Sequence, residues 1–365
     1  MEIIQTMKTL YEKLPGYGFS PEAEAALGAY LLQLRESDEL LQLAQVYHDE
    51  IFEEEKYTLA QMEELGEQQG EQMGMLFAAM FLARYEQLEQ VFARRKIPGK
   101  YKQGALMLYK QLLQKSKNFY GTFGLRGMYR SEYSRFLRAD KYVLGRLTFE
   151  VTKFNPPYYA VYRDRETGDS IPVAQPGYFY MPNGRQKTDD YQGELFEPYL
   201  KQTGDLLECF TFDEKLGHLL PDAITFDLTR YEIALQAGDD ILSVHIPENG
   251  PMTPELVDEA FAIAEEFFPA HYPEKTFRAY ICSSWLLNTD FQKLLNPESN
   301  ILRYQERFRI VTTSTNWYSI YWHIFGIQQF IPHEQLQPKN RFQQTLLDWV
   351  RAGNTLYNGN GYILK

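Results

Sequence analysis

Apolar residues recur at helical spacing through the first 139 residues of the chain. A run over residues 21–34 follows Ser20 and begins with proline, and these residue types typically cap and start a helix. Residues 37–48 repeat the arrangement of a serine followed by acidic residues. Residues 74–95 again carry apolar side chains at helical spacing and end in arginines. The pattern predicts a helical N-terminal domain over residues 1–139.

The pattern changes near residue 140, where β-branched and aromatic residues begin to alternate with polar ones. Residues 142–154 are typical of extended chain. Residues 158–174 predict a hairpin with a Thr-Gly-Asp turn. Residues 223–247 predict a second hairpin, with its turn at 237–240. Antiparallel pairs of strands are therefore expected to open the second domain.

One strand–helix–strand unit follows these hairpins. A strand ends at Pro247, a helix begins at Thr253, and residues 277–287 predict the next strand. If the two strands lie parallel in one sheet, their connection is a right-handed crossover. Residues 290–308 then predict two short helical pieces, and residues 309–325 predict a long strand. A further helix is expected near the end of the chain, over residues 341–353. The predicted fold class is α+β, with a mixed β-sheet domain and flanking helices over residues 140–365.

The charge and cysteine content narrow the possible partners. The formal net charge is −12 and the pI about 5.1, which disfavours nucleic acid and anionic membrane surfaces. Cys209 and Cys282 are too far apart in sequence to indicate a disulfide framework or a zinc site. The longest apolar run, residues 73–83, is shorter than the ~20 residues that span a bilayer. We expect a cytoplasmic protein that binds neither nucleic acid nor membrane.

Several catalytic motifs are missing from the sequence. It contains no G-x-S-x-G elbow, no H-E-x-x-H, no phosphate loop ending in Gly-Lys-Ser/Thr and no Rossmann fingerprint. Residues 121–127 have glycines at a spacing of three, but they follow a predicted helix and so indicate a helix break. Elbow-type serine hydrolysis, metalloprotease chemistry and P-loop phosphoryl transfer have no support, and no metal site is expected.

The junction between the strand 241–247 and the helix after Thr253 is a candidate anion site. The first N–H groups of a helix have no partner within the helix, and the helix dipole is positive there. Such a helix start can hold a pyrophosphate. The alternative is an ordinary strand-to-helix connection that binds nothing, and the carboxylates of Glu248 and Glu255 act against an anion.

From about residue 140 onward, the chain resembles the GNAT-like C-terminal domain of a family of bacterial two-domain N-acyltransferases. Residues 242–268 and 280–311 carry this resemblance. The helical first 139 residues resemble the N-terminal domain of the same family, including residues 124–150 at the join. The resemblance implies a helical domain over 1–139 and a GNAT-like acyltransferase domain over 140–365.

The resemblance also implies acyl-CoA as the co-substrate, with no metal. In this family, acyl-CoA lies along a splayed strand, and its pyrophosphate lies at the start of the next helix. In this sequence the strand would be 241–247 and the loop 248–253. The usual Q/R-x-x-G-x-G/A motif of the loop is reduced here to one glycine. The implied cofactor-binding residues are Val244, Ile246, Pro247, Asn249, Gly250, Met252 and Thr253.

The resemblance further implies direct attack of an amine on the thioester. Tyr304 matches a tyrosine that protonates the leaving thiolate, with simple packing beside the sheet as the alternative. His245 is a candidate base for the incoming ammonium, or else a hydrogen-bonded histidine on a strand. Ser284 is a candidate hydrogen-bond donor, whereas Cys282 has no basic neighbour in sequence and is not expected to be a nucleophile.

The acceptor implied is a small-molecule or peptide amine, and the acidic composition favours a cationic one. Two other functions stay open. The incomplete glycine motif is compatible with a non-catalytic binding or regulatory protein on a degenerate GNAT scaffold. The many aromatic residues, including 27 Tyr and 24 Phe, are compatible with a carbohydrate-active or carbohydrate-binding protein that has exposed aromatic platforms. The spacing of the acids singles out no catalytic carboxylate pair.

Overall fold

The computed structural model forms two compact units, each described here by itself. The first contains residues 1–144 and 267–272, and the second contains residues 145–266 and 273–365. A helical region over 2–137 thus precedes a mixed β-sheet region, which confirms the predicted α+β class. The predicted domain boundary at 139/140 stays a prediction. The structure describes residues 2–155, 158–188, 191–248, 250–313, 321–327 and 331–365.

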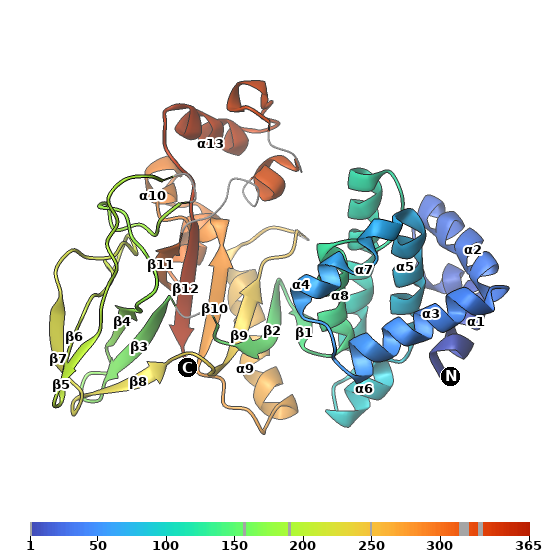
Figure 1. Ribbon diagram of the computed structural model, residues 1–365, viewed down its shortest axis with the longest axis horizontal. Coiled ribbons are helices and arrows are strands. Elements are labelled where there is room, and N and C mark those ends of the chain that lie inside the picture. Colours follow the sequence, from blue (N-terminus) through green and yellow to red (C-terminus); the bar gives the residue numbers. More distant parts are fainter. Residues whose placement is uncertain (1, 156–157, 189–190, 249, 314–320, 328–330) are drawn as a thin grey trace. The chain divides into compact units, whose positions relative to one another are not determined.

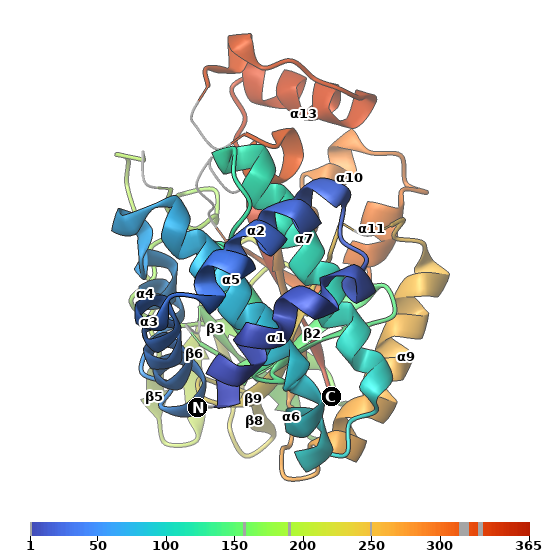
Figure 2. The same cartoon turned by 90° about the vertical axis from the view of Figure 1, so that its right-hand side faces the viewer.

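The first unit is a group of helices around the buried helix α5 (Figures 1 and 2). The two predicted serine caps are confirmed, because Ser20 Oγ accepts from the Ala23 amide and Ser37 Oγ from the Leu40 amide. Residues 73–83 of α5 are buried, as a continuous apolar run requires. The helices are α1 (Glu2–Tyr17), α2 (Pro21–Arg35), α3 (Asp38–His48), α4 (Leu59–Glu64), α5 (Glu71–Glu86), α6 (Leu88–Arg94), α7 (Lys102–Tyr120) and α8 (Met128–Leu137).

The predicted helix break at residues 121–127 is confirmed between α7 and α8. Gly124 there has a φ of +146° and packs directly on α5, where a Cβ atom would come within 2.8 Å of the Gly74 carbonyl carbon. The Leu125 amide also donates to the Gly74 carbonyl. Gly124 therefore serves a close backbone approach within the helical unit. No described helix of the chain is both long and apolar enough to cross a membrane.

The second unit contains the main sheet, in which the strand order is β2-β9-β10-β12-β11 (Figure 1). Strands β9 and β10 run parallel and are joined by α9 (Pro254–His271), which confirms the predicted strand–helix–strand unit. The other neighbours in this order run antiparallel. The strands are β2 (Leu147–Lys153), β9 (Asp240–His245), β10 (Ala279–Ser284), β11 (Arg309–Thr313) and β12 (Asn358–Leu364), and β1 (Lys141–Leu144) precedes them in the first unit.

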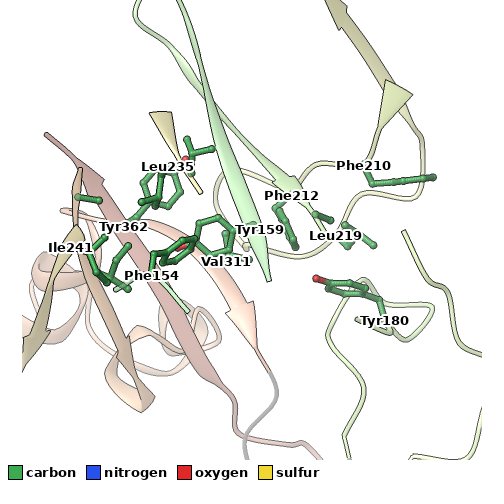
Figure 3. Close-up of a cluster of buried hydrophobic side chains, with 14 residues drawn as sticks. Phe154, Tyr159, Tyr180, Phe210, Phe212, Leu219, Leu235, Ile241, Val311 and Tyr362 are labelled. Carbon is green, nitrogen blue, oxygen red and sulfur yellow. The ribbon is translucent and has the colours of Figure 1, made fainter. Parts of the chain in front are cut away.

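Two small antiparallel sheets complete the β region, in the orders β4-β3-β8 and β5-β6-β7. The hairpin predicted over 158–174 is confirmed as β3 and β4. Their apolar side chains join those of the main sheet in one buried cluster that includes Tyr159, Ile241 and Tyr362 (Figure 3). The strands are β3 (Tyr159–Asp164), β4 (Ser170–Ala174), β5 (Lys201–Thr203), β6 (Leu206–Cys209), β7 (Ile224–Asp227) and β8 (Tyr231–Leu235).

The second predicted hairpin, over residues 223–247, is wrong. Its strands enter three different sheets, because β7 pairs with β6, β8 with β3, and β9 with β2 and β10. Alternation of apolar and polar residues identified the strands but carries no information about which distant strand each one meets.

The predicted long strand over 309–325 is also wrong in extent. Residues 309–313 form β11, residues 321–325 form a π-helix, and residues 314–320 lie outside the described residues. The two helical pieces predicted in 290–308 are confirmed as α10 (Phe291–Leu294) and α11 (Asn300–Gln305). They share an apolar cluster with the π-helix and with α13 (Arg341–Arg351).

Strand β12 lies between β10 and β11 and was not predicted from the sequence. Its residues Asn358–Leu364 begin with alternating asparagine and glycine, which are poor strand formers. The glycines are required by packing. A Cβ atom on Gly359 would lie 2.2 Å from the Leu287 carbonyl oxygen, and one on Gly361 would lie 2.8 Å from Phe308 Cβ.

A Gly359→Ala substitution should therefore destabilise the second unit by about 1–3 kcal/mol, because the added methyl meets backbone that cannot move aside easily. Tryptophan fluorescence during urea unfolding would measure this, since all four tryptophans lie between residues 285 and 349. Gly16→Ala is the matched control, because nothing lies within 4 Å of its added methyl. An unchanged tryptophan transition in Gly359→Ala would contradict the expected clash.

Candidate functional site

The ladder between the parallel strands β9 and β10 stops before their carboxyl ends. Their ladder contains two register pairs, Tyr280 with Leu242 and Ile281 with Ser243. On its other side, β9 stays paired with β2 as far as His245, and β10 stays paired with β12 as far as Ser284. Each strand is thus held by its outer neighbour while the inner ladder stops. The facing backbone of residues 244–245 and 282–284 lies outside that ladder.

One face of β9 is apolar. Leu242 and Val244 are buried. Val244 is in register with Phe149, whose ring contacts Phe261 of α9 at 5.6 Å, so this face packs on the helix. Ile246 and Pro247 continue beyond the strand and are half-buried.

His245 lies on the opposite face of β9 in a short polar chain with Glu150 and Ser243. Its Nε2 atom is 3.0 Å from Glu150 Oε2 and 3.4 Å from Ser243 Oγ. The Glu150 carboxylate is 8% exposed and the His245 ring 39% exposed. The imidazole therefore meets solvent while a buried carboxylate orients it. Glu150 was not among the predicted site residues. The available signal was an acidic residue in the middle of the extended segment predicted over 142–154.

The start of α9 is capped from within the chain. The Thr253 carbonyl accepts from the Val257 amide at 3.1 Å, and Thr253 Oγ1 lies 3.5 Å from the Leu256 amide. The exposed Glu255 carboxylate accepts from its own amide and from the Thr253 hydroxyl, and these bonds lower its pKa. A negative side chain thus already interacts with the positive end of the helix.

The loop before α9 is held by Arg146, a nearly buried residue of the β1–β2 turn. Its guanidinium donates to the carbonyls of Pro247, Gly250 and Pro251, each at 2.8 Å. Gly250 has a φ of +146°, a conformation that strongly favours glycine.

Two further loop residues, Asn249 and Met252, were predicted to bind the cofactor. Met252 is half-buried, next to the capping residue Thr253, and Asn249 lies outside the described residues. Pro247, Pro251 and Pro254 have no amide hydrogen, so the loop has few backbone donors for an anion.

Tyr304 lies on α11 and is buried. Its hydroxyl donates to the Cys282 thiol of β10 at 3.5 Å, so the helix carries the phenol to the strand that borders the open ladder. Burial, and then the adjacent Cys282, raises the pKa of Tyr304 well above its ordinary value. The side chain is 1% exposed, which means that a ligand could reach the hydroxyl only after a local rearrangement.

Ser284 ends β10 and is half-buried. Its Oγ accepts from the Leu286 amide at 3.1 Å and so caps the following short 3₁₀ helix, Trp285–Leu287. The proposed role of Ser284 as a hydrogen-bond donor to a ligand stays a prediction. Among the residues that the structure describes, no group of three or more His, Cys, Asp or Glu side chains is arranged to hold a metal ion.

Comparison with protein families gives one match. The model of the family described as the GNAT-like C-terminal domain matches residues 142–363, which is more than half of the chain. No curated protein matches the sequence.

Solved acyltransferase structures share the fold over nearly the whole chain. An acyltransferase in complex with decanoyl-CoA and teicoplanin has a TM-score of 0.65 at 17% identity, covering 97% of this chain and 86% of that chain. A mutant acyltransferase in complex with octanoyl-CoA gives the same values. The acyltransferase in complex with CoA and 10C-teicoplanin has a TM-score of 0.57 at 17% identity, covering 99% of this chain and 86% of that chain. Such low identity establishes the fold alone.

The enclosed position of Cys282 can be tested by its reactivity. Burial raises the pKa of the Cys209 and Cys282 thiols to about 12, so both are protonated near neutral pH. We expect neither to react with Ellman's reagent at pH 8 in the native protein, and both to react after unfolding. A Cys209→Ser variant isolates the signal of Cys282. Rapid labelling of Cys282 in the native variant would contradict its burial against Tyr304.

Proposed function

This chain belongs to the family defined by the GNAT-like C-terminal domain, and from that membership we propose that it is an acyl-CoA-dependent N-acyltransferase. The observation that supports this most directly is the interrupted ladder between β9 and β10. Backbone N–H and C=O groups at the edge of a strand are strong hydrogen-bonding groups that require partners. The amide-containing arm of acyl-CoA, lying between the two strands, would supply them.

In this arrangement the diphosphate of CoA lies at the start of α9, beside Gly250 and Thr253. The arm then passes Val244, Ile246 and Pro247 and brings the thioester to the carboxyl end of the open ladder. Met252 borders the same loop. This assignment uses the general affinity of helix starts for anions. The acyl group would continue past the thioester toward the acceptor.

The reaction we propose is direct transfer. The acceptor nitrogen attacks the thioester carbonyl, a C–N bond forms and the C–S bond breaks. CoA leaves as a thiolate, which takes up the proton that the nitrogen loses when the amide forms. His245 accepts the proton of the incoming ammonium, with Glu150 orienting the imidazole and stabilising its charged form. Ser284 would donate a hydrogen bond near the reacting carbonyl. Holding both substrates in one orientation supplies a further part of the rate.

The role of Tyr304 is better described as hydrogen-bond donation than as full proton transfer. A phenol with a pKa well above 10 transfers a proton to a thiolate of lower pKa only at a free-energy cost. Its hydroxyl can nevertheless stabilise negative charge on sulfur, and it already donates to a sulfur atom in Cys282.

The relatives guide the choice of substrates to be tested. Their structures contain decanoyl-CoA, octanoyl-CoA and the glycopeptide teicoplanin. We propose a small-molecule or peptide amine as the acceptor for this chain, and medium-chain acyl-CoA as a first donor to compare with acetyl-CoA.

A second function is a non-catalytic binding or regulatory protein on the same scaffold. Two observations favour it: the Glu255 carboxylate already bonds at the start of α9, and Tyr304 is enclosed. Catalysis of acyl transfer distinguishes the two functions. A non-catalytic protein would bind acyl-CoA, but no free CoA thiol would appear when an amine is added.

We expect acetyl-, octanoyl- or decanoyl-CoA to bind in isothermal titration calorimetry, and free thiol to appear when an amine acceptor is added. Gly250→Ala should weaken binding, because its φ of +146° is strained for alanine and the loop must change. Gly238→Ala is the matched control: it has a φ of +88° and equally open surroundings, but precedes β9 instead of following it. Absence of binding at millimolar acyl-CoA would exclude the enzyme.

Replacement of the proposed base should affect turnover more than binding. His245→Gln should lower kcat by about 10²–10⁴-fold and remove the acidic limb of the pH profile of kcat/KM. Glu150→Gln should give a smaller decrease, because the imidazole is retained but loses its charged partner. His333→Gln, a half-buried histidine of a 3₁₀ helix outside this polar chain, is the control. Wild-type kcat in His245→Gln would contradict the assignment.

A further inference from the structure

Arg146 is the one side chain in the described contacts that binds the loop before α9 at three points. Nε donates to the Pro251 carbonyl, Nη1 to Pro247 and Nη2 to Gly250, each at 2.8 Å. These carbonyls lie at both ends of the segment 247–251. Arg146 is distant in sequence, in the turn between β1 and β2, and is 9% exposed. The planar guanidinium can reach three acceptors at once, which a lysine ammonium cannot do with the same geometry.

These contacts determine which way the peptide groups of the loop point. In a trans peptide, the carbonyl of one residue and the amide hydrogen of the next point in opposite directions. The Pro247 and Pro251 carbonyls point at Arg146, so the amides of Glu248 and Met252 point away from it. The Gly250 carbonyl is followed by Pro251, which has no amide hydrogen.

The loop cannot obtain this arrangement from a glycine-rich sequence. Between Pro247 and Pro254 it contains one glycine and three prolines. Each proline removes a donor and fixes one backbone angle, so few amides are available and their direction matters more. Carbonyl oxygens that turned toward an anion would repel it. The guanidinium of Arg146 binds these carbonyls on one side of the loop. An anion on the opposite side of the loop is therefore not repelled by them.

We propose that Arg146 is a positioning residue for the diphosphate of acyl-CoA, acting through the loop 247–251. It holds the carbonyls of Pro247, Gly250 and Pro251 away from the ligand and leaves the Met252 amide directed toward it. This inference rests on the proposed function. Arg146, from another part of the chain, thus fixes the loop backbone in the way that a run of small residues would otherwise do.

Arg307 acts at the neighbouring helix start in a different way. It forms an ion pair with the Asp258 carboxylate of α9 and donates to the Pro254 carbonyl at 3.3 Å. It therefore fixes the first turn of α9, while Arg146 fixes the loop that precedes it. The proposed role of Arg146 does not depend on this second contact.

The test compares ligands with and without the diphosphate. Arg146→Ala should weaken binding of CoA about 10- to 100-fold, the loss expected for hydrogen bonds to a charged group. Binding of the matching acyl-pantetheine, which has the thioester arm but no diphosphate, should not change. The KM for acyl-CoA should rise by a similar factor. The kcat, measured at saturating acyl-CoA, should stay within about twofold of the wild-type value.

Two further variants separate positioning from general stability. Arg146→Lys retains the charge but not the three-point contact, and we expect an intermediate loss of CoA affinity; it carries the test if Arg146→Ala does not fold. Added guanidinium at low millimolar concentration should restore part of the CoA affinity of Arg146→Ala. Arg130→Ala is the burial-matched control, because that arginine also donates to backbone carbonyls but in the helical unit, and it should lower thermal stability without changing the CoA affinity.

Equal losses of CoA and acyl-pantetheine binding in the Arg146 variants would overturn the inference, because they would indicate damage to the whole site. Unchanged CoA affinity would overturn it as well. Either result would leave the proposed function intact as long as the wild-type protein binds and turns over acyl-CoA. A wild-type protein that binds neither ligand would instead remove the proposed function, and this inference with it.

Discussion

The site depends on one constraint in the main sheet, which is that β9 and β10 are each held more firmly by an outer neighbour than by one another. Strand β2 pairs with β9 to its end and β12 pairs with β10 to its end, whereas the parallel ladder between them has two register pairs. The separation is therefore built into the hydrogen bonding of the sheet. The start of α9 follows the carboxyl end of β9, and Tyr304 of α11 contacts Cys282 of β10.

The surrounding residues compensate for a loop that is poor in glycine. Arg146 orders the backbone before α9, Arg307 holds the first turn of the helix, and Thr253 caps it. Each contact comes from a different part of the second unit. These contacts fix the backbone around a loop that has a single glycine, Gly250. The Glu255 carboxylate is exposed and is the feature that opposes an anion there.

Local chemistry was predictable from the sequence, and long-range pairing was not. The serine caps at Ser20 and Ser37 and the strand–helix–strand unit were found because each depends on residues close in sequence. The segment 223–247 was mistaken for a hairpin because strand alternation does not specify a partner. Strand β12 was missed because its glycines give the segment a low strand propensity. Close packing against Leu287 and Phe308 nevertheless requires these glycines. Glu150 was missed for a related reason, since its importance comes from a histidine on another strand.

Tyr304 shows how a residue type can be identified from the sequence while its chemical state cannot. The helix that carries it was predicted, but its burial and its bond to Cys282 arise only when α11 packs on β10. Burial keeps the phenol protonated and makes it a hydrogen-bond donor to sulfur. The protein's own thiol is its present acceptor, and a thioester sulfur in the open ladder would offer the same kind of acceptor atom. Acyl transfer would then require a local rearrangement in which Tyr304 exchanges one sulfur partner for another, without a change in its protonation.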